Sequence, residues 1–207
     1  WIKQLHPQST TALGPIPRQG EDERFPGGFV ISGEKCPNRL GVEGVAYWFE
    51  QPPLRFNDLL ARTAEGHFDV IVVLGGYIKP WIDAEQADAL RRATALIVAD
   101  VFPTPLSDRA DLIFGMAFFA EREGSYVNRQ HRLQWSARAI RPPFGSRCLG
   151  SVFWELGGMS GLYQPREVLA EIARTIPYFS AASGEIPECG VDLRVNQLAE
   201  QTVSTGQ

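Results

Sequence analysis

The residues with the clearest potential for chemistry follow two apolar runs of the chain. Gly75 and Gly76 come directly after the first run, whereas Asp100 lies near the end of the second, with Thr104 four residues later. Adjacent glycines let a backbone approach a phosphate closely, and a carboxylate can accept hydrogen bonds from a ribose or a base edge. Paired glycines are also common turn residues. The segment does not fit G-x-G-x-x-G, so direct binding of a nicotinamide cofactor is disfavoured.

A strand–helix–strand unit is expected to position these loops. Residues 68–74 and 96–102 are continuous runs of mainly apolar residues, typical of strands buried on both faces of a parallel sheet. Between them, Asp83 is an N-cap with Gln86 in the capping-box position, and the helix is predicted to extend through Thr94. This unit is a right-handed βαβ crossover. Ligands of such sheets bind beyond the carboxyl ends of the strands, where the two loops lie.

Caps, turns and prolines predict the remaining elements. A short helix is expected from an N-cap at Asn57 to Gly66. Short strands are expected within residues 110–119 and at 125–128. A last helix begins at Pro165, since proline is favoured in a first turn, and stops before Pro177. These elements suggest three parts, namely an irregular Pro/Gly-rich arm (1–44) with one strand candidate at 29–32, an α/β domain (45–180) and a polar tail (181–207).

Composition excludes several classes of function. The chain has 207 residues, 44% of them hydrophobic, so it can build a core. A net charge of −4 gives little support for phosphate-backbone binding, and nucleic acid is not an expected partner. The longest apolar run is far shorter than the roughly 20 residues of a membrane-spanning helix. Because the chain starts with Trp1, we expect a processed chain or an excised fragment.

The cysteines and histidines show no metal-binding or catalytic spacing. The three cysteines are far apart and form no C-x-x-C pair, so neither zinc nor an iron–sulfur cluster has its usual ligand pattern. We expect free thiols in a reducing compartment, and hence a cytoplasmic protein. The three histidines are scattered. Three acids could suggest a carboxylate pair, but solvation or pairing with Arg122 and Arg109 explains them, namely Glu121, Glu123 and Asp111. No catalytic residue is predicted. The residues concerned are Cys36, Cys148, Cys189, His6, His67 and His131.

Several segments in order resemble a known family. They are 99–104 (ADVFPT), 109–111 (RAD), 123–134 (EGSYVNRQHRLQ) and 142–147 (PPFGSR). Together they resemble the molybdopterin oxidoreductases, closest to the C-terminal molybdopterin-like domain of the large iron–sulfur subunit of NADH:quinone oxidoreductase. The resemblance runs from about Leu59 to Ile176. It implies a three-layer α/β domain with a parallel sheet, of the formate dehydrogenase/DMSO reductase type.

The same resemblance implies a vestigial cofactor site and also gives reasons to doubt that a pterin binds. Pro105 replaces an acid, and Phe114-Gly115 replaces Leu-Pro. Gln130-His131 replaces a Glu-Gly pair, whose glycine leaves room beside the backbone for the pterin. We therefore expect neither a metal nor a cofactor in this chain. The vestigial cofactor-binding residues are Gly75, Gly76, Asp100, Thr104, Glu123, Gly124, Asn128, Arg132 and Gln134. Without a pterin, Arg132 needs an anionic or carbonyl partner, and Glu123 is the nearest candidate by family geometry.

The resulting hypothesis is a fragment or domain of a respiratory-type oxidoreductase subunit with a structural or assembly role. Its partners would be other subunits or domains of that complex, which could hold it at the membrane periphery, and the chain alone would not be catalytic. One alternative is a segment of an active molybdopterin or tungstopterin enzyme, similar to formate or formylmethanofuran dehydrogenase, that binds molybdopterin guanine dinucleotide. Another is a nucleotide-binding module that uses Gly75, Gly76 and Asp100 without redox chemistry.

Overall fold

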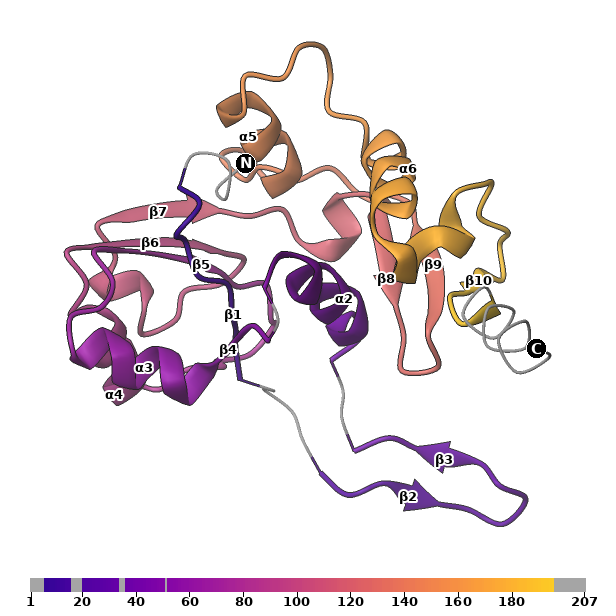
Figure 1. Cartoon of the computed structure of the whole chain (residues 1–207), viewed down its shortest axis with the longest axis horizontal. Coiled ribbons are helices and arrows are strands. Elements are labelled where there is room, and N and C mark those ends of the chain that lie inside the picture. Colours follow the sequence, from indigo (N-terminus) through magenta and orange to yellow (C-terminus); the bar gives the residue numbers. More distant parts are fainter. Residues whose placement is uncertain (1–5, 16–19, 34–35, 51, 196–207) are drawn as a thin grey trace, which may run out of the picture.

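The computed structural model describes residues 6–15, 20–33, 36–50 and 52–195 (Figure 1). The elements in chain order are β1 (Ala12–Leu13), β2 (Glu23–Arg24), β3 (Val30–Ile31), α2 (Arg39–Phe49), β4 (Leu54–Arg55), α3 (Phe56–Ala64), β5 (Val70–Leu74), α4 (Ala84–Leu90), β6 (Ala95–Asp100), η1 (Ser107–Arg109), β7 (Leu112–Gly115), η2 (Phe119–Glu121), β8 (Gly124–Val127), β9 (Arg132–Ser136), α5 (Leu149–Leu156), α6 (Pro165–Thr175), η3 (Pro177–Ala182) and β10 (Val191–Asp192).

A parallel sheet in the order β5-β6-β7 confirms the predicted crossover. Strand β6 is central and buried along most of its length, as its apolar run predicts. The capping box of α4 is also confirmed, because Asp83 Oδ1 accepts the Gln86 N–H at 2.8 Å and Gln86 Oε1 accepts the Asp83 N–H at 3.2 Å. However, α4 ends at Leu90, before Thr94. Ala93 N–H bonds to the carbonyl of Leu90, three residues back, so the helix tightens into a turn.

One face of this sheet is covered by α3 and α4, which lie together on one side of the strands in Figure 1. Both connections between the strands contribute to this layer, since Leu90 of α4 and Leu106 of the β6–β7 connection join the same core. The buried members of this core are Phe56, Ile71, Ile82, Ala87, Leu90, Ala93, Leu96, Val98 and Leu106.

The opposite face is open along β5, so the prediction that this strand is buried on both faces is wrong. Val70, Val72 and Leu74 are 56%, 40% and 51% exposed. Side chains alternate across a strand, and Ile71 between them faces the core. The apolar composition of β5 favours burial on both faces, although one of its faces is exposed here. Right-handed crossovers that step in one direction across a sheet put their connections on one face only.

A second core joins the β8–β9 hairpin to the helices that follow it. Strand β9 pairs with β8 on one side and with β10 on the other. Helix α6 and η3 pack against the hairpin, and α2 contributes partly buried side chains. In Figure 1 this module lies at the opposite end of the molecule from β5–β7. Its buried residues are Val127, Leu133, Leu169, Ala173, Ile176, Phe179, Ala182 and Leu193.

Regular structure extends further into both flanking segments than the sequence predicts. Helix α2 begins at Arg39, inside the segment expected to be an irregular arm. Within the expected polar tail, Leu193 is buried and β10 pairs with β9. The remainder of that tail, residues 196–207, lies outside the described residues. At α3, Arg55 takes the N-cap position predicted for Asn57, which lies inside the helix.

Candidate functional site

The carboxyl edge of the sheet brings three of the predicted site residues together. Asp100 ends β6 and is 6% exposed. Its Oδ1 accepts the backbone N–H groups of Gly76 at 2.8 Å and Val101 at 2.7 Å, and its Oδ2 accepts the indole N–H of Trp81 at 3.0 Å. Because these donors satisfy the buried carboxylate, Asp100 braces the loop after β5 from inside.

Gly75 and Gly76 are required to be glycine for different structural reasons. A Cβ at Gly75 would lie 2.1 Å from Asp100 Oδ2, so only glycine leaves room for the carboxylate. Gly76 has φ = +127°, a region that L side chains rarely adopt. The Gly76 N–H donates to Asp100 and so is not free to bind a phosphate. Trp81 was missed because its role depends on a side-chain contact with Asp100, 19 residues away.

Thr104 lies beyond the end of β6 and keeps one unpaired polar atom. Its backbone N–H donates to Ser107 Oγ at 3.0 Å, which fixes the turn before η1. Its side-chain Oγ1 is buried, and no hydrogen-bond partner is present among the described residues. A buried hydroxyl of this kind requires an explanation, since an unmade bond costs about 1 to 3 kcal/mol. Thr104 is therefore a predicted site residue with a buried hydroxyl that is free to bond.

The hairpin residues of the predicted site lie at two separate ends. Gly124 pairs with Ser136 at the open end, whereas Asn128 and Arg132 flank the turn. The four residues of β8 between these ends span about 14 Å at about 3.4 Å per residue. Glu123, next to Gly124, is therefore remote from Arg132. The structure does not bring the hairpin residues into one cluster.

Arg132 bonds to carbonyls, so Glu123 was the wrong partner. Its Nη1 lies 3.3 Å from the carbonyl oxygens of Cys189 and Gly190, in the segment before β10. The antiparallel register explains the difference, because it sets Arg132 beside Asp192. The expectation of an anionic or carbonyl partner is met by the carbonyls.

The hairpin turn is organised by Asn128 and by a strained histidine. Asn128 Oδ1 accepts the N–H groups of Gln130 at 2.9 Å and Arg132 at 3.1 Å, which closes the turn. His131, in the position that the family pattern gives to glycine, has φ = +58°. Its Nδ1 lies 3.0 Å from the Tyr178 hydroxyl, within hydrogen-bond distance. The side chain thus holds a backbone conformation that favours glycine.

Two further residues of this region are Glu121, which fixes a turn, and Gln134, which is exposed. Glu121 was not predicted as a site residue, because the sequence explains its acid by solvation or by pairing with a neighbouring arginine. Its Oε2 accepts the Phe118 N–H at 2.8 Å, which fixes the turn before the hairpin. The exposed Gln134 lies in β9 opposite Tyr126.

Three groups with shifted pKa values lie around the β8–β9 turn and not at the sheet edge beside Asp100. Hydrogen bonds from Arg129 hold the pKa of Asp22 at about 2, below its usual 3.8. Arg194 lowers the pKa of Asp192 in the same way. Burial raises the pKa of Tyr178. Within the described ranges, no three His, Cys, Asp or Glu side chains are grouped to hold a metal ion, and no helix is long and apolar enough to span a bilayer.

Comparison with known proteins identifies the family. The molybdopterin oxidoreductase family matches residues 41–158, more than half of the chain, and the chain belongs to this family. It is similar to the NADPH-Fe(3+) oxidoreductase subunit alpha of two strains of Geobacter sulfurreducens, with 30% identity over 97 residues, 45% of this chain and 12% of that protein. It is also similar to the NADH-quinone oxidoreductase G subunit of Pseudomonas fluorescens, with 36% identity over 86 residues, 41% of this chain and 10% of that protein. These matches thus cover only about a tenth of each relative.

Proposed function

We propose that this chain is a structural domain of a larger oxidoreductase and binds no pterin of its own. The observation that carries the proposal is the bonding of Asp100. The acid that the family resemblance places at a cofactor site is buried and accepts three donors from its own chain. A ligand phosphate or ribose at this edge would have to displace Gly76 or Trp81 from the carboxylate, leaving buried polar groups to find new partners.

The remaining predicted residues also fit the cofactor poorly. The hairpin separates Glu123 and Gly124 from Asn128 and Arg132 by about 14 Å, the length of β8. Asn128 and Arg132 both bond to protein backbone. The buried Thr104 hydroxyl supports the alternative, a segment of an active enzyme that binds molybdopterin guanine dinucleotide. The single unpaired hydroxyl of Thr104 is weaker evidence than the three hydrogen bonds that Asp100 accepts from its own chain.

We further propose that the open sheet face belongs to a three-layer domain completed by other parts of such an oxidoreductase. Parallel sheets are normally covered on both faces. Here α3 and α4 cover one, and β5 exposes Val70, Val72 and Leu74 on the other. Covering these side chains would stabilise the assembly by burial of apolar surface. The names of the relatives, both described as subunits, agree with a role within a complex.

Substitution on the open face tests this proposal. Val72→Lys with Leu74→Lys adds charge where the isolated chain is exposed, so its unfolding free energy should change by less than about 1 kcal/mol. The same change should abolish co-purification of the tagged chain with the oxidoreductase polypeptides of its native cells. Leu162→Lys, at another exposed apolar position, is the matched control. Unchanged co-purification of the double variant would contradict the proposal.

A further inference from the structure

A surface with cations and apolar side chains is built on the loop between β9 and α5. Residues 137–147 contain three arginines and no acid, although the whole chain has a net charge of −4. Arg138 and Arg141 are exposed, and no ion pair joins either to the described residues. Between and after them, Ile140 is 55% exposed and Phe144 is fully exposed. We call Arg138, Ile140, Arg141 and Phe144 the Arg–Phe loop surface.

The loop is fixed to the body of the molecule at both ends. Backbone N–H groups of Ala139 and Ile140 bond to the Ala120 carbonyl at 2.8 and 3.0 Å. At the other end, the Arg147 N–H bonds to the Gly115 carbonyl at 3.0 Å, at the carboxyl end of β7. Anchors of this kind lower the entropy that a partner must remove on binding.

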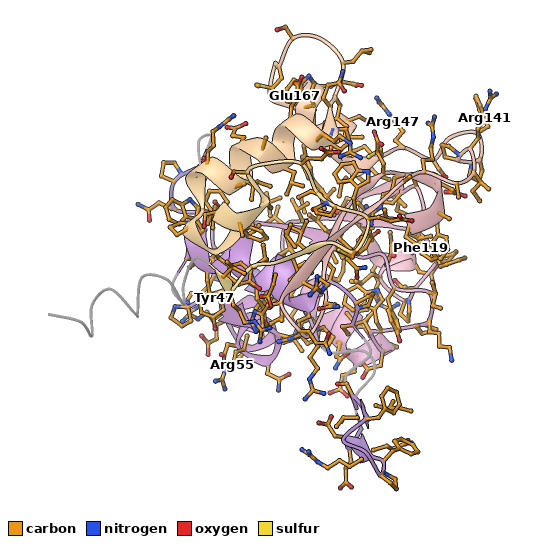
Figure 2. The ribbon with its side chains drawn as sticks, turned by 90° about the vertical axis from the view of Figure 1, so that its right-hand side faces the viewer. Tyr47, Arg55, Phe119, Arg141, Arg147 and Glu167 are labelled. Carbon is orange, nitrogen blue, oxygen red and sulfur yellow. The ribbon has the colours of Figure 1, made fainter. Side chains whose placement is uncertain are left out.

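Exposed aromatic residues continue the surface toward the sheet. Phe119, next to Ala120, packs on Phe118 with ring centroids 4.3 Å apart, and Phe118 in turn contacts Phe102 at 6.1 Å. Phe102 and Phe119 are about half exposed. Figure 2 shows Arg141 at the outer end of its loop, with Arg147 and Phe119 toward the same side of the view and Tyr47 and Arg55 toward the opposite side. The surface thus extends to the sheet edge where the vestigial site was predicted.

The composition of this surface favours a protein partner over a membrane. Arginine and aromatic residues are enriched at protein interfaces, whereas lysine, absent from this loop, is depleted there. Recognition of anionic lipid usually requires a cluster of about four to eight cations, more than Arg138 and Arg141 provide. Charge complementarity requires acidic side chains on the partner, near an apolar pocket that can receive Phe144.

We propose that the Arg–Phe loop surface docks onto another polypeptide of the same oxidoreductase, at a surface with acidic side chains near an apolar pocket. This inference rests on the proposed function and deepens it, because it names a second surface, besides the open β5 face, through which the domain contacts its complex. Arg138 and Arg141 supply charge complementarity, and Phe144 and Ile140 supply the apolar contact. The open β5 face is a separate surface of the domain.

Site-directed photocrosslinking in the native cells tests the proposal. A photoreactive phenylalanine analogue at position 144 should give one discrete adduct, on a polypeptide of the oxidoreductase and within a peptide that contains Asp or Glu. Arg138→Glu with Arg141→Glu should reduce its yield at least about tenfold, because like charges then face each other. Arg55→Glu with Arg62→Glu is the matched control and should leave the yield unchanged. The analogue at Tyr47 should not give this adduct.

Rescue by charge exchange completes the test. Replacement of the crosslinked acids by Arg should restore the adduct with Arg138→Glu and Arg141→Glu. If the Glu variants fold poorly, Arg138→Gln and Arg141→Gln should still reduce the yield. Labelling of lipid, scattered labelling or an unchanged yield would overturn the proposal. Detection of a bound pterin would overturn the proposed function alone, so the two failures are distinguishable.

Discussion

The carboxylate of Asp100 occupies the space that a side chain at position 75 would fill, with Oδ2 at 2.1 Å from the position of a Gly75 Cβ. The acid and the glycine are 25 positions apart, at the ends of neighbouring strands. Because of this contact, the acid that was predicted to bind a ligand instead supports the loop after β5. The same contact explains why the glycine is needed without any bound phosphate.

Gly75→Ala should destabilise the chain by about 2 to 3 kcal/mol, because the added methyl group overlaps a buried carboxylate that is held by three donors. Gly184→Ala is the control, since nothing lies within 4 Å of its added Cβ. That change should be neutral within about 0.5 kcal/mol. Urea unfolding of both variants measures the difference. Equal stability of the two variants would show that Asp100 can move aside freely.

The strained backbone at His131 gives a prediction in which glycine is the better substitute. Both His131→Gly and His131→Ala lose the contact with Tyr178, but only alanine keeps a side chain at φ = +58°. His131→Gly should therefore be more stable than His131→Ala by about 1 kcal/mol. At the neighbouring Gln130, alanine should be the more stable of the two. The same order at both positions would rule out strain at His131.

Arg132 should contribute modestly and independently of Glu123. Its bonds to the carbonyls of Cys189 and Gly190 are long, at 3.3 Å, and lie at a partly exposed position. Arg132→Ala should cost about 1 kcal/mol. A double-mutant cycle with Glu123→Gln should show no coupling beyond about 0.3 kcal/mol, because no contact joins the two. Coupling above about 1 kcal/mol would show that Arg132 and Glu123 form the ion pair that the family resemblance implies.

Acid should weaken the attachment of the β2–β3 hairpin to the β8–β9 turn. Asp22 accepts both Arg129 Nη groups and the Gly33 N–H at 3.0 Å, and its pKa is about 2 instead of 3.8. Because the folded pKa is depressed, this contribution is complete above about pH 4 and is lost as the pH falls toward 2. NMR titration of the Asp22 carboxyl and the Gly33 amide measures it. Arg129→Gln should raise the Asp22 pKa, and an unchanged titration would contradict the assignment.

The elements predicted correctly are those encoded by local signals. The capping box of Asp83 and Gln86 specifies the start of α4, and Pro165 at the first position specifies α6. The β6 run identifies the central strand. Each of these signals operates over a few residues, so one sequence is enough to detect it.

The features that were missed depend on contacts between distant residues. Helix α2 contains Gly41 and Gly44, which have low helix propensity, but an added Cβ would lie 2.4 Å from Asn38 Oδ1 at the first and 2.7 Å from Tyr178 at the second. Close packing explains these glycines. The carbonyl partners of Arg132 lie 57 and 58 residues further along the chain. Side-chain periodicity carries no information about such pairs.

Metal and pterin analysis of the purified protein tests the central claim most directly. We predict no stoichiometric molybdenum, tungsten or iron and no pterin fluorescence after denaturation, because the donors at the sheet edge are bonded to Asp100 and the hairpin residues are dispersed. The protein should be purified anaerobically from its native cells, so that a labile cofactor is retained. One molybdenum or tungsten per chain, together with released pterin, would contradict the structural role and establish this chain as part of an active site.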